Sequence, residues 1–213
     1  MTRRHRDPEA ALVAAGTRLF SRHGYDAVSI DDIAAEAGLA KGLLYYYFAG
    51  KRALYLAVVR AAADALAERT VPDPALPAAR RTAAVLDAVI EWAKEYGENS
   101  RLLLSQHAGP DPELQAILQA ARTRQVDMML AGMRRTGAEL GLPPAGETPA
   151  LRYAVRGWIA FIEGVLTQWL DERDLSESEL RELFLHAAGG LLTAARRAER
   201  PARPRARRDS PER

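Results

Sequence analysis

The sequence predicts an all-α protein with about nine helices, and three observations lead to this class. Alanine, leucine and arginine dominate the 213 residues while β-branched residues are sparse, a composition that favours helix. Apolar residues recur at spacings of three and four along most of the chain. Helix-capping residues precede many of these periodic segments, and Gly or Pro follows them. The chain length suits either one large helical domain or a small domain joined to a larger one.

The first four predicted helices occupy the N-terminal third of the chain. Asp7 and Pro8 begin the first, and Gly24 ends it. Ser29 caps the second, and Asp32 stands three residues on as a variant of the capping box. Gly38 can take the positive φ of the turn that follows. The expected ranges are 8–23, 29–37, 40–47 and 51–69.

The remaining helices alternate with Pro- and Gly-containing segments. Asp111 and Pro112 repeat the helix start seen near residue 8, and Ser176 with Glu179 forms a second capping box. The expected ranges are 75–97, 101–106, 111–141, 149–170 and 175–196. Gly157 and Gly164 lie seven residues apart on one face, where another helix could approach closely.

Charge is distributed unevenly along the chain. Residues 1–60 hold nine basic and six acidic residues, residues 61–195 hold thirteen and nineteen, and residues 196–213 hold eight and three. A basic head and tail around an acidic middle indicates that only part of the chain meets a polyanion. For the tail alone, a role in solubility is an equal alternative. We divide the chain into a helix-turn-helix domain, a helical domain and a disordered basic tail, at residues 1–58, 59–196 and 197–213.

The usual signatures of enzymes and metal sites are missing from the sequence. There is no cysteine, the four histidines have no metal-ligand spacing, and no catalytic or dinucleotide-binding motif appears. Glu163, inside an aromatic helix, is the most suggestive single acid, with an edge position beside a polar partner as the simpler interpretation. The apolar run Trp158–Ile162 is far too short for a membrane span. We therefore predict a cytoplasmic protein that is not an enzyme, with no catalytic residue, metal or cofactor and no membrane partner.

Residues 29–48 fit a helix-turn-helix, in which the second helix enters the DNA major groove. The alternative is a plain helical hairpin whose aromatic side chains pack onto neighbours. Against it, Tyr45, Tyr46 and Tyr47 are consecutive, so their side chains point about 100° apart and cannot share one core. At least one of the three must be exposed.

Residues 9–58 resemble the N-terminal domain of the tetracycline-repressor (TetR) family of transcriptional regulators. The matching text includes the helix-ending His-Gly-Tyr, DDIAAEAG and KGLLYYYFAGK. The resemblance implies phosphate contacts for several positions, base-facing roles for Leu43 and Tyr46, and a close approach to DNA at Gly42. The implied DNA-binding residues are Ser29, Lys41, Gly42, Leu43, Tyr45, Tyr46, Tyr47 and Lys51. Two residues depart from the family pattern: Ala40 replaces a capping Ser, and Leu43 replaces a smaller residue.

The resemblance also implies that the C-terminal helices form a homodimer and a ligand pocket. We expect 149–170 and 175–196 to pair with their copies, although these faces could instead be intrachain core. The candidate pocket residues are Trp92, Tyr96, His107, Met128, Met129, Tyr153, Trp158 and Phe161, each of which could equally be ordinary core. Their aromatic and thioether groups favour an apolar or aromatic effector.

These observations predict a ligand-responsive regulator, a repressor that binds a palindromic double-stranded DNA operator as a dimer and is released by a small molecule. The alternative is a helical small-molecule-binding or adaptor protein without a DNA target. Salt dependence separates the two, because binding to DNA weakens steeply as salt rises.

Overall fold

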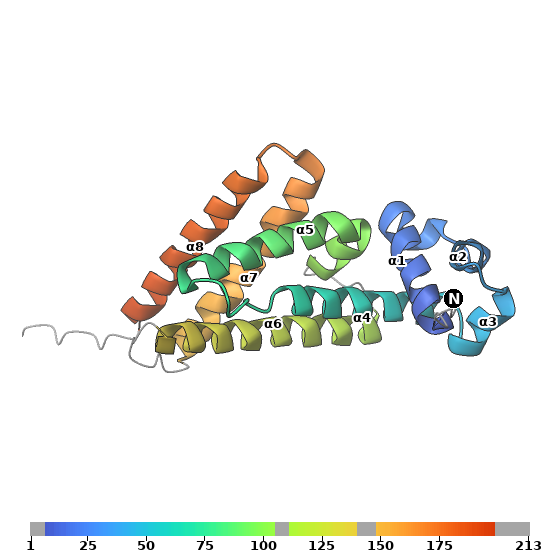
Figure 1. Cartoon of the computed structure of the whole chain (residues 1–213), viewed down its shortest axis with the longest axis horizontal. Helices are drawn as coiled ribbons and strands as arrows, with labels where there is room; N and C mark the ends of the chain where they lie inside the picture. The colour runs from blue at the N-terminus through green and yellow to red at the C-terminus, as the bar shows by residue number, and fades with distance from the viewer. Residues whose placement is uncertain (1–6, 105–110, 140–147, 199–213) are drawn as a thin grey trace, which may run out of the picture.

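The structure is a computed structural model that describes residues 7–104, 111–139 and 148–198. Within these ranges it is all-helical, as predicted, and contains no strand. Eight helices follow one another along the chain (Figure 1). They are α1 (Pro8–Ala27), α2 (Ile30–Ala37), α3 (Lys41–Tyr47), α4 (Lys51–Arg69), α5 (Ala78–Leu104), α6 (Pro112–Glu139), α7 (Pro149–Glu172) and α8 (Glu177–Ala198). None of the described helices is both long enough and apolar enough to cross a membrane.

The difference between eight helices and the predicted nine arises at Gly97. Its φ of 46° and ψ of −120° are non-helical and make a kink at which two helical segments adjoin within α5. The predicted short helix at 101–106 therefore begins as the last turn of α5, and its residues 105 and 106 lie outside the described ranges. Gly24 has the same effect in α1, where φ is 74° and the helix resumes as far as Ala27.

The helix starts follow the capping residues in the sequence. Asp7 accepts a hydrogen bond from the Glu9 N–H at 3.0 Å, with Pro8 in the first turn of α1. Before α8, the Ser176 N–H donates to Glu179 Oε2 at 2.9 Å, and the Glu179 N–H donates to Ser176 Oγ at 3.3 Å. Both predicted helix starts are thus confirmed.

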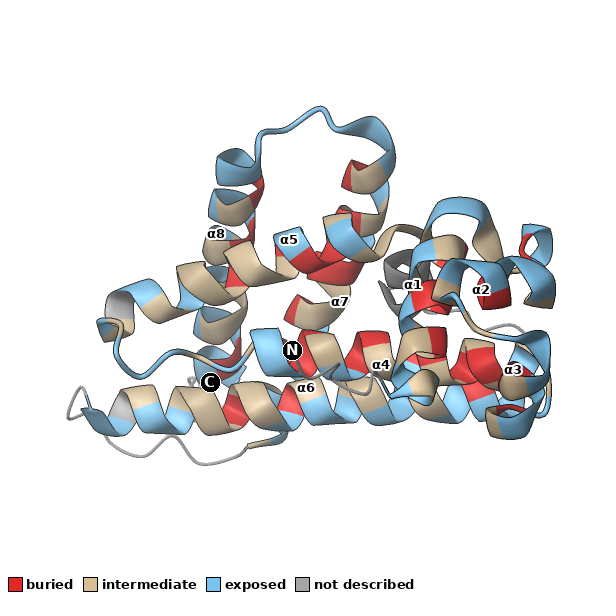
Figure 2. Cartoon of the chain, turned by 45° about the vertical axis from the view of Figure 1, so that its right-hand side comes forward, coloured by how far each residue is buried: buried red, intermediate tan, exposed pale blue. Residues whose placement is uncertain are grey.

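Two hydrophobic clusters share helix α4 (Figure 2). In the N-terminal cluster, α4 contributes Leu54 and Val58, which pack with buried residues of α1, α2 and α3. In the larger cluster, it contributes Leu56 and Val59, which pack with buried residues of α5 to α8. A single continuous helix therefore belongs to both ends of the molecule.

Two further contacts join the N-terminal helices to the rest of the chain. The bend at Gly97 brings α5 so close to α1 that a Cβ at this position would lie 2.7 Å from the Ser21 carbonyl oxygen. At the start of α4, the Arg52 guanidinium lies 2.9 Å from Asp111 and 3.1 Å from Glu113, at the start of α6. The hydrogen bond from Arg52, together with one from the Leu114 N–H, holds the pKa of Asp111 below its usual value. Helices α1 and α4 are therefore each tied to the C-terminal helices by a contact outside the two clusters.

Candidate nucleic-acid interface

The turn between α2 and α3 is fixed by two local devices. At the start of α2, the Ser29 N–H donates to Asp32 Oδ2 at 2.9 Å, and the Asp32 N–H donates to Ser29 Oγ at 3.1 Å. This capping box is the predicted one. The Ser29 hydroxyl also donates to Asp32 Oδ2 at 2.6 Å, and this bond, together with the one from the Ser29 N–H, lowers the pKa of Asp32. At the end of α2, Gly38 has φ 67° and ψ 31°, and its N–H donates to the Ala35 carbonyl at 3.0 Å. The positive φ expected at Gly38 is confirmed.

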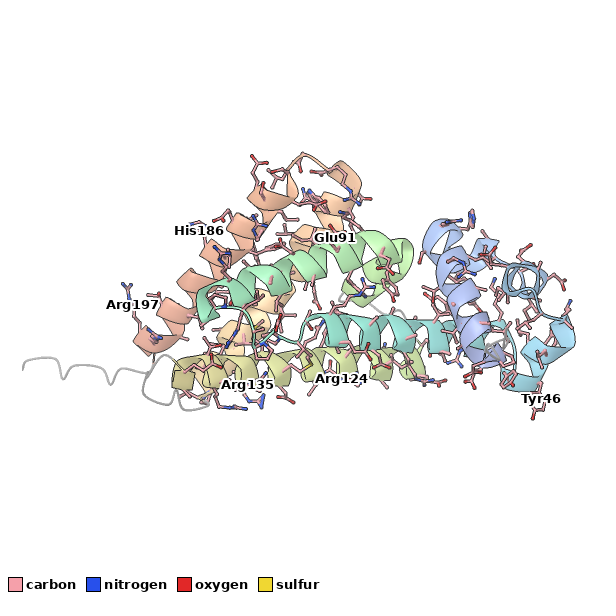
Figure 3. The ribbon with its side chains drawn as sticks, in the orientation of Figure 1. Tyr46, Glu91, Arg124, Arg135, His186 and Arg197 are labelled. Atoms are coloured by element: carbon pink, nitrogen blue, oxygen red, sulfur yellow. The ribbon has the colours of Figure 1, made fainter. Side chains whose placement is uncertain are left out.

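Helix α3 separates a buried face from an exposed one. Leu44 is fully buried and Phe48, just beyond the helix, is nearly so, and both belong to the N-terminal cluster. Tyr45 and Tyr46 are 53% and 79% exposed, and Tyr46 points away from the body of the protein (Figure 3). Tyr47 is half-buried and packs against the cluster. The inference that at least one of the three tyrosines is exposed is therefore correct.

Helix α3 begins without a side-chain cap and presents a bare surface there. Ala40 makes no capping hydrogen bond, as its side chain predicts. Gly42 is exposed, and a Cβ at this position would meet no other described residue within 4 Å. Leu43 is half-buried. The start of α3 is thus open to the close approach of another molecule.

Two lysines flank α3, and each is held by residues that sequence reasoning did not identify. Lys41 Nζ lies 2.8 Å from Asp31 Oδ1, and its hydrogen bond to this carboxylate raises the pKa of Lys41. Lys51 Nζ donates to the Asp26 carbonyl at 3.3 Å and sits 4.4 Å from the ring centroid of Tyr25. Asp31 lies ten residues from Lys41, across the turn, and Asp26 lies 25 residues from Lys51, so no local spacing signals either partner.

Seven of the eight candidate effector residues are described, and none of the seven lines the cavity that lies between α6 and α7. Five of them, Trp92, Tyr96, Met129, Trp158 and Phe161, belong to the larger cluster or pack against it. The indole N–H groups of both tryptophans are satisfied, since Trp92 donates to the Ala62 carbonyl at 3.1 Å and Trp158 to the Phe184 carbonyl at 2.9 Å.

The other three candidates lie elsewhere. Tyr153 is 74% exposed on α7, and Met128 is half-buried on α6. His107 lies outside the described residues. A cavity of about 270 Å³ instead opens between α6 and α7.

Glu163 lies in this cavity and is 6% exposed, so it is a buried residue rather than an edge residue. Burial raises the pKa of Glu163 to about 7, although Arg122 opposes the shift. The Arg122 Nε atom is 3.5 Å from Glu163 Oε1, which is the polar partner that the sequence left unidentified.

Comparison with known families identifies both parts of the chain. The family described as "Bacterial regulatory proteins, tetR family" matches residues 12–58, and "Tetracyclin repressor-like, C-terminal domain" matches residues 78–189. The second match alone covers more than half of the 213 residues.

Curated relatives carry the same regulatory names. The transcriptional activator FasR of Mycolicibacterium smegmatis is 30% identical over 116 residues, or 52% of this chain and 51% of FasR. The regulator RutR of Escherichia coli is 28% identical over 144 residues, or 63% of this chain and 65% of RutR. The chain thus spans between about half and two thirds of the length of these relatives.

Solved structures extend the likeness over nearly the whole chain. A tetR-family regulator from Streptomyces coelicolor is 28% identical, with a TM-score of 0.78, covering 91% of this chain and 83% of that one. FadR from Bacillus subtilis, solved with stearoyl-CoA, has a TM-score of 0.62 at 18% identity, covering 86% of this chain and 97% of that one. At that identity the likeness to FadR concerns the fold alone.

Proposed function

Because the chain belongs to the TetR family of transcriptional regulators, we propose that it is a cytoplasmic repressor that binds a palindromic operator as a dimer and leaves it when a small molecule binds. The family and the curated relatives are regulators rather than enzymes. One observation carries the proposal for this chain: α3 anchors Leu44 in the core and turns Tyr45 and Tyr46 to solvent. A short helix with exposed aromatic hydroxyls and flanking lysines suits the major groove, which is about 12 Å wide.

We divide the roles of the interface residues between positioning and reading. Lys41, Lys51 and the hydroxyls of Tyr45 and Tyr47 would contact phosphates, because cations and hydroxyl donors suit phosphate oxygens. Ser29, at the start of α2, would contact the backbone beside them. Leu43 and Tyr46 would face the bases, where an apolar side chain can meet a thymine methyl group. The open surface at Gly42 supports a close approach of the helix to the DNA.

Dimerisation through α7 and α8 is the second part of the proposal. Two recognition helices must lie about 34–36 Å apart to reach successive major grooves, which one copy cannot provide. A Cβ at Gly157 or at Gly164 would meet no other described residue within 4 Å, so both positions on α7 are open in a single chain. These open positions support a second copy packing there.

We keep the domain boundary at residue 58 as part of this proposal, with a DNA-binding unit before it and an effector-binding and dimerisation unit after it. The name of FasR identifies an activator. For this chain we propose repression, because a protein that occupies the operator blocks transcription from it. A reporter gene placed downstream of the operator tests repression against activation.

We expect Tyr45→Ala and Lys51→Ala each to weaken operator binding about tenfold without unfolding the protein, because each side chain is largely outside the core. Gel-shift titration at several salt concentrations measures the effect. The slope of log affinity against log salt should fall by about one for Lys51→Ala, which loses a positive charge, and should change little for Tyr45→Ala, which loses a neutral hydroxyl. Lys94→Ala is the matched control, since Lys94 pairs with Glu91 and Glu177 in the C-terminal helices. Unchanged affinity in both interface variants would refute the assignment.

We expect Gly164→Glu to convert the dimer to a monomer while leaving the chain folded, because the new side chain meets open space in one chain and a second copy in the dimer. Sedimentation equilibrium measures the mass, and circular dichroism checks the helix content. Gly164→Ala is the control: it should keep the dimer and stabilise α7 by roughly 0.5–1 kcal/mol. A wild-type protein that sediments as a monomer at micromolar concentration would contradict the dimer itself.

The alternative is a helical adaptor or small-molecule-binding protein without a DNA target. Selection of genomic fragments with purified protein distinguishes it from a regulator. A regulator enriches a palindromic sequence, and its binding weakens steeply with salt. An adaptor enriches none.

A further inference from the structure

The cavity between α6 and α7 is built by two facing helical stripes. Helix α6 contributes Gln119, Arg122 and Thr123, and α7 contributes Arg156 and Glu163. All five side chains are polar, and four of them can donate hydrogen bonds at any ordinary pH. The site is therefore rich in donors and contains a single carboxyl group.

Positive charge is in excess in this cavity. Arg122 lies beside Glu163, with 3.5 Å between Arg122 Nε and Glu163 Oε1. Arg156 makes no ion pair within the described parts of the chain, whereas Arg152, one turn earlier on α7, lies 3.3 Å from Asp127. The lining thus contains two guanidinium groups, with Arg122 half-buried and Arg156 exposed at the mouth, against one carboxyl group, and this excess of positive charge favours an anion as the ligand.

The remaining wall limits what the anion can carry. Val126, Ile159 and Ala160 line the apolar side. The volume of about 270 Å³ lies just below the 300–1,000 Å³ typical of pockets for drug-sized ligands. There is room for a ring or a short branched chain.

We propose that this cavity binds a small monocarboxylate with a compact apolar body, whose carboxylate is held by Arg156 and Arg122 and accepts a hydrogen bond from protonated Glu163. Planar guanidinium groups match carboxylate geometry in pairs, which favours a carboxylate over a spherical anion. That such a compound is the effector rests on the proposed function, but its binding to the cavity does not.

Binding of this kind takes up a proton. The pKa of Glu163 is about 7 in the free protein, and a carboxylate placed beside it disfavours its charged form further. The bound state therefore keeps a proton that the free protein loses above pH 7. Affinity should be higher below this pH and should fall as the pH rises through it.

The charged groups on the helices around Glu163 support this assignment. On α6, Arg122 is the charged residue that acts on the Glu163 carboxyl, and on α7 itself Arg156 borders the same cavity. Helices α5 and α8, which also pack against α7, pair their own charges with one another: Arg181 lies 2.8 Å from Asp87 and Lys94 lies 2.6 Å from Glu177. None of these four residues lines the cavity.

Three isosteric probes separate the possible ligand charges: benzoate, benzamide and benzamidinium. We expect calorimetric titration of the full-length protein at pH 6 to rank benzoate first. Between pH 6 and pH 8 its affinity should fall about five- to tenfold, since benzoate itself stays ionised across this range. A higher affinity for benzamidinium, an affinity for benzoate that does not change with pH, or no benzoate binding at millimolar concentration would overturn the proposal.

Single substitutions test which side chains bind benzoate and which one makes the binding depend on pH. Arg156→Met should weaken benzoate binding about fivefold or more, and Arg152→Met, outside the cavity, should leave it unchanged. Glu163→Gln keeps a donor but cannot titrate, so it should bind benzoate at pH 6 and lose the pH dependence. Equal effects of the two arginine variants, or a pH dependence that survives in Glu163→Gln, would contradict the proposed contacts.

A gel shift without any probe tests the proposed function separately. Benzoate binding in a protein that binds no operator would leave the cavity assignment standing and refute the regulator. Operator binding without benzoate binding would support the regulator and refute the cavity assignment.

Discussion

Gly97→Ala is expected to lower the free energy of unfolding by about 2–4 kcal/mol, measured by urea denaturation. Two physical costs combine at this position. The residue has a φ of 46°, which side chains disfavour, and a Cβ would lie 2.7 Å from the backbone carbonyl oxygen of Ser21. Because the obstructing atom is backbone, α1 or α5 must move as a whole to relieve the overlap.

Two control glycines separate these costs. Gly24 has φ 74° and ψ 169°, a backbone region essentially restricted to glycine, but a Cβ there would meet no other described residue within 4 Å, so Gly24→Ala should cost only the backbone strain of about 1–3 kcal/mol. Gly132, on α6, has helical φ and only an ordinary contact of 3.6 Å to Pro72, so Gly132→Ala should be neutral or stabilising. If Gly97→Ala were no worse than Gly24→Ala, the close contact between α1 and α5 would not contribute to stability.

Glu163→Gln is expected to have the second large effect: it should change how the free energy of unfolding depends on pH. Between pH 4.5 and about 7 the native protein keeps a proton on Glu163 that the unfolded chain has released. The native state therefore binds more protons in this window, and its stability falls as the pH rises through it. Above pH 7 Glu163 is ionised in both states. The loss of folding stability caused by its burial is then constant, at up to about 3 kcal/mol for a shift of this size.

The measurement is the stability difference between variant and wild type at pH 5 and at pH 8. The variant does not titrate at this position, so it should gain on the wild type by up to about 3 kcal/mol as the pH rises. Its absolute stability also includes the loss of the charge facing Arg122, which is why the change with pH is the informative quantity. Glu68→Gln, on the exposed side of α4, is the control and should give a much smaller change. A difference that is flat between the two pH values would contradict the burial of an ionisable carboxyl group.

Much of the fold could be predicted because its local signals are strong. The capping residues Asp7, Ser29 and Ser176 and the turn at Gly38 each act within a few residues of the backbone they satisfy. The bend at Gly97 could not be predicted in the same way. Glycine permits both a helix end and a bend, and the choice depends on α1, which is distant in the sequence.

The two candidate sites differ in how well the sequence predicts them, and the reason is again whether the signal is local. The exposed face of α3 follows from consecutive tyrosines on one short helix, a purely local pattern. The cavity between α6 and α7 depends on which stripes of two long helices face each other. Aromatic content pointed instead to Trp92 and Trp158, whose indole N–H groups are satisfied within the core.

Helix α4 contributes residues to both hydrophobic clusters, and this limits how domains of two such regulators can be joined in a chimera. Leu54 and Val58 serve one cluster while Leu56 and Val59, on the same turns, serve the other. A chimera that exchanges the DNA-reading helices of two relatives must therefore cut through a helix whose neighbouring positions belong to different cores. A junction at residue 58 would graft one relative's Leu56 onto another's α5 to α8. Operator specificity and effector specificity should thus be exchangeable only when the residues of α4 are chosen to match both parents.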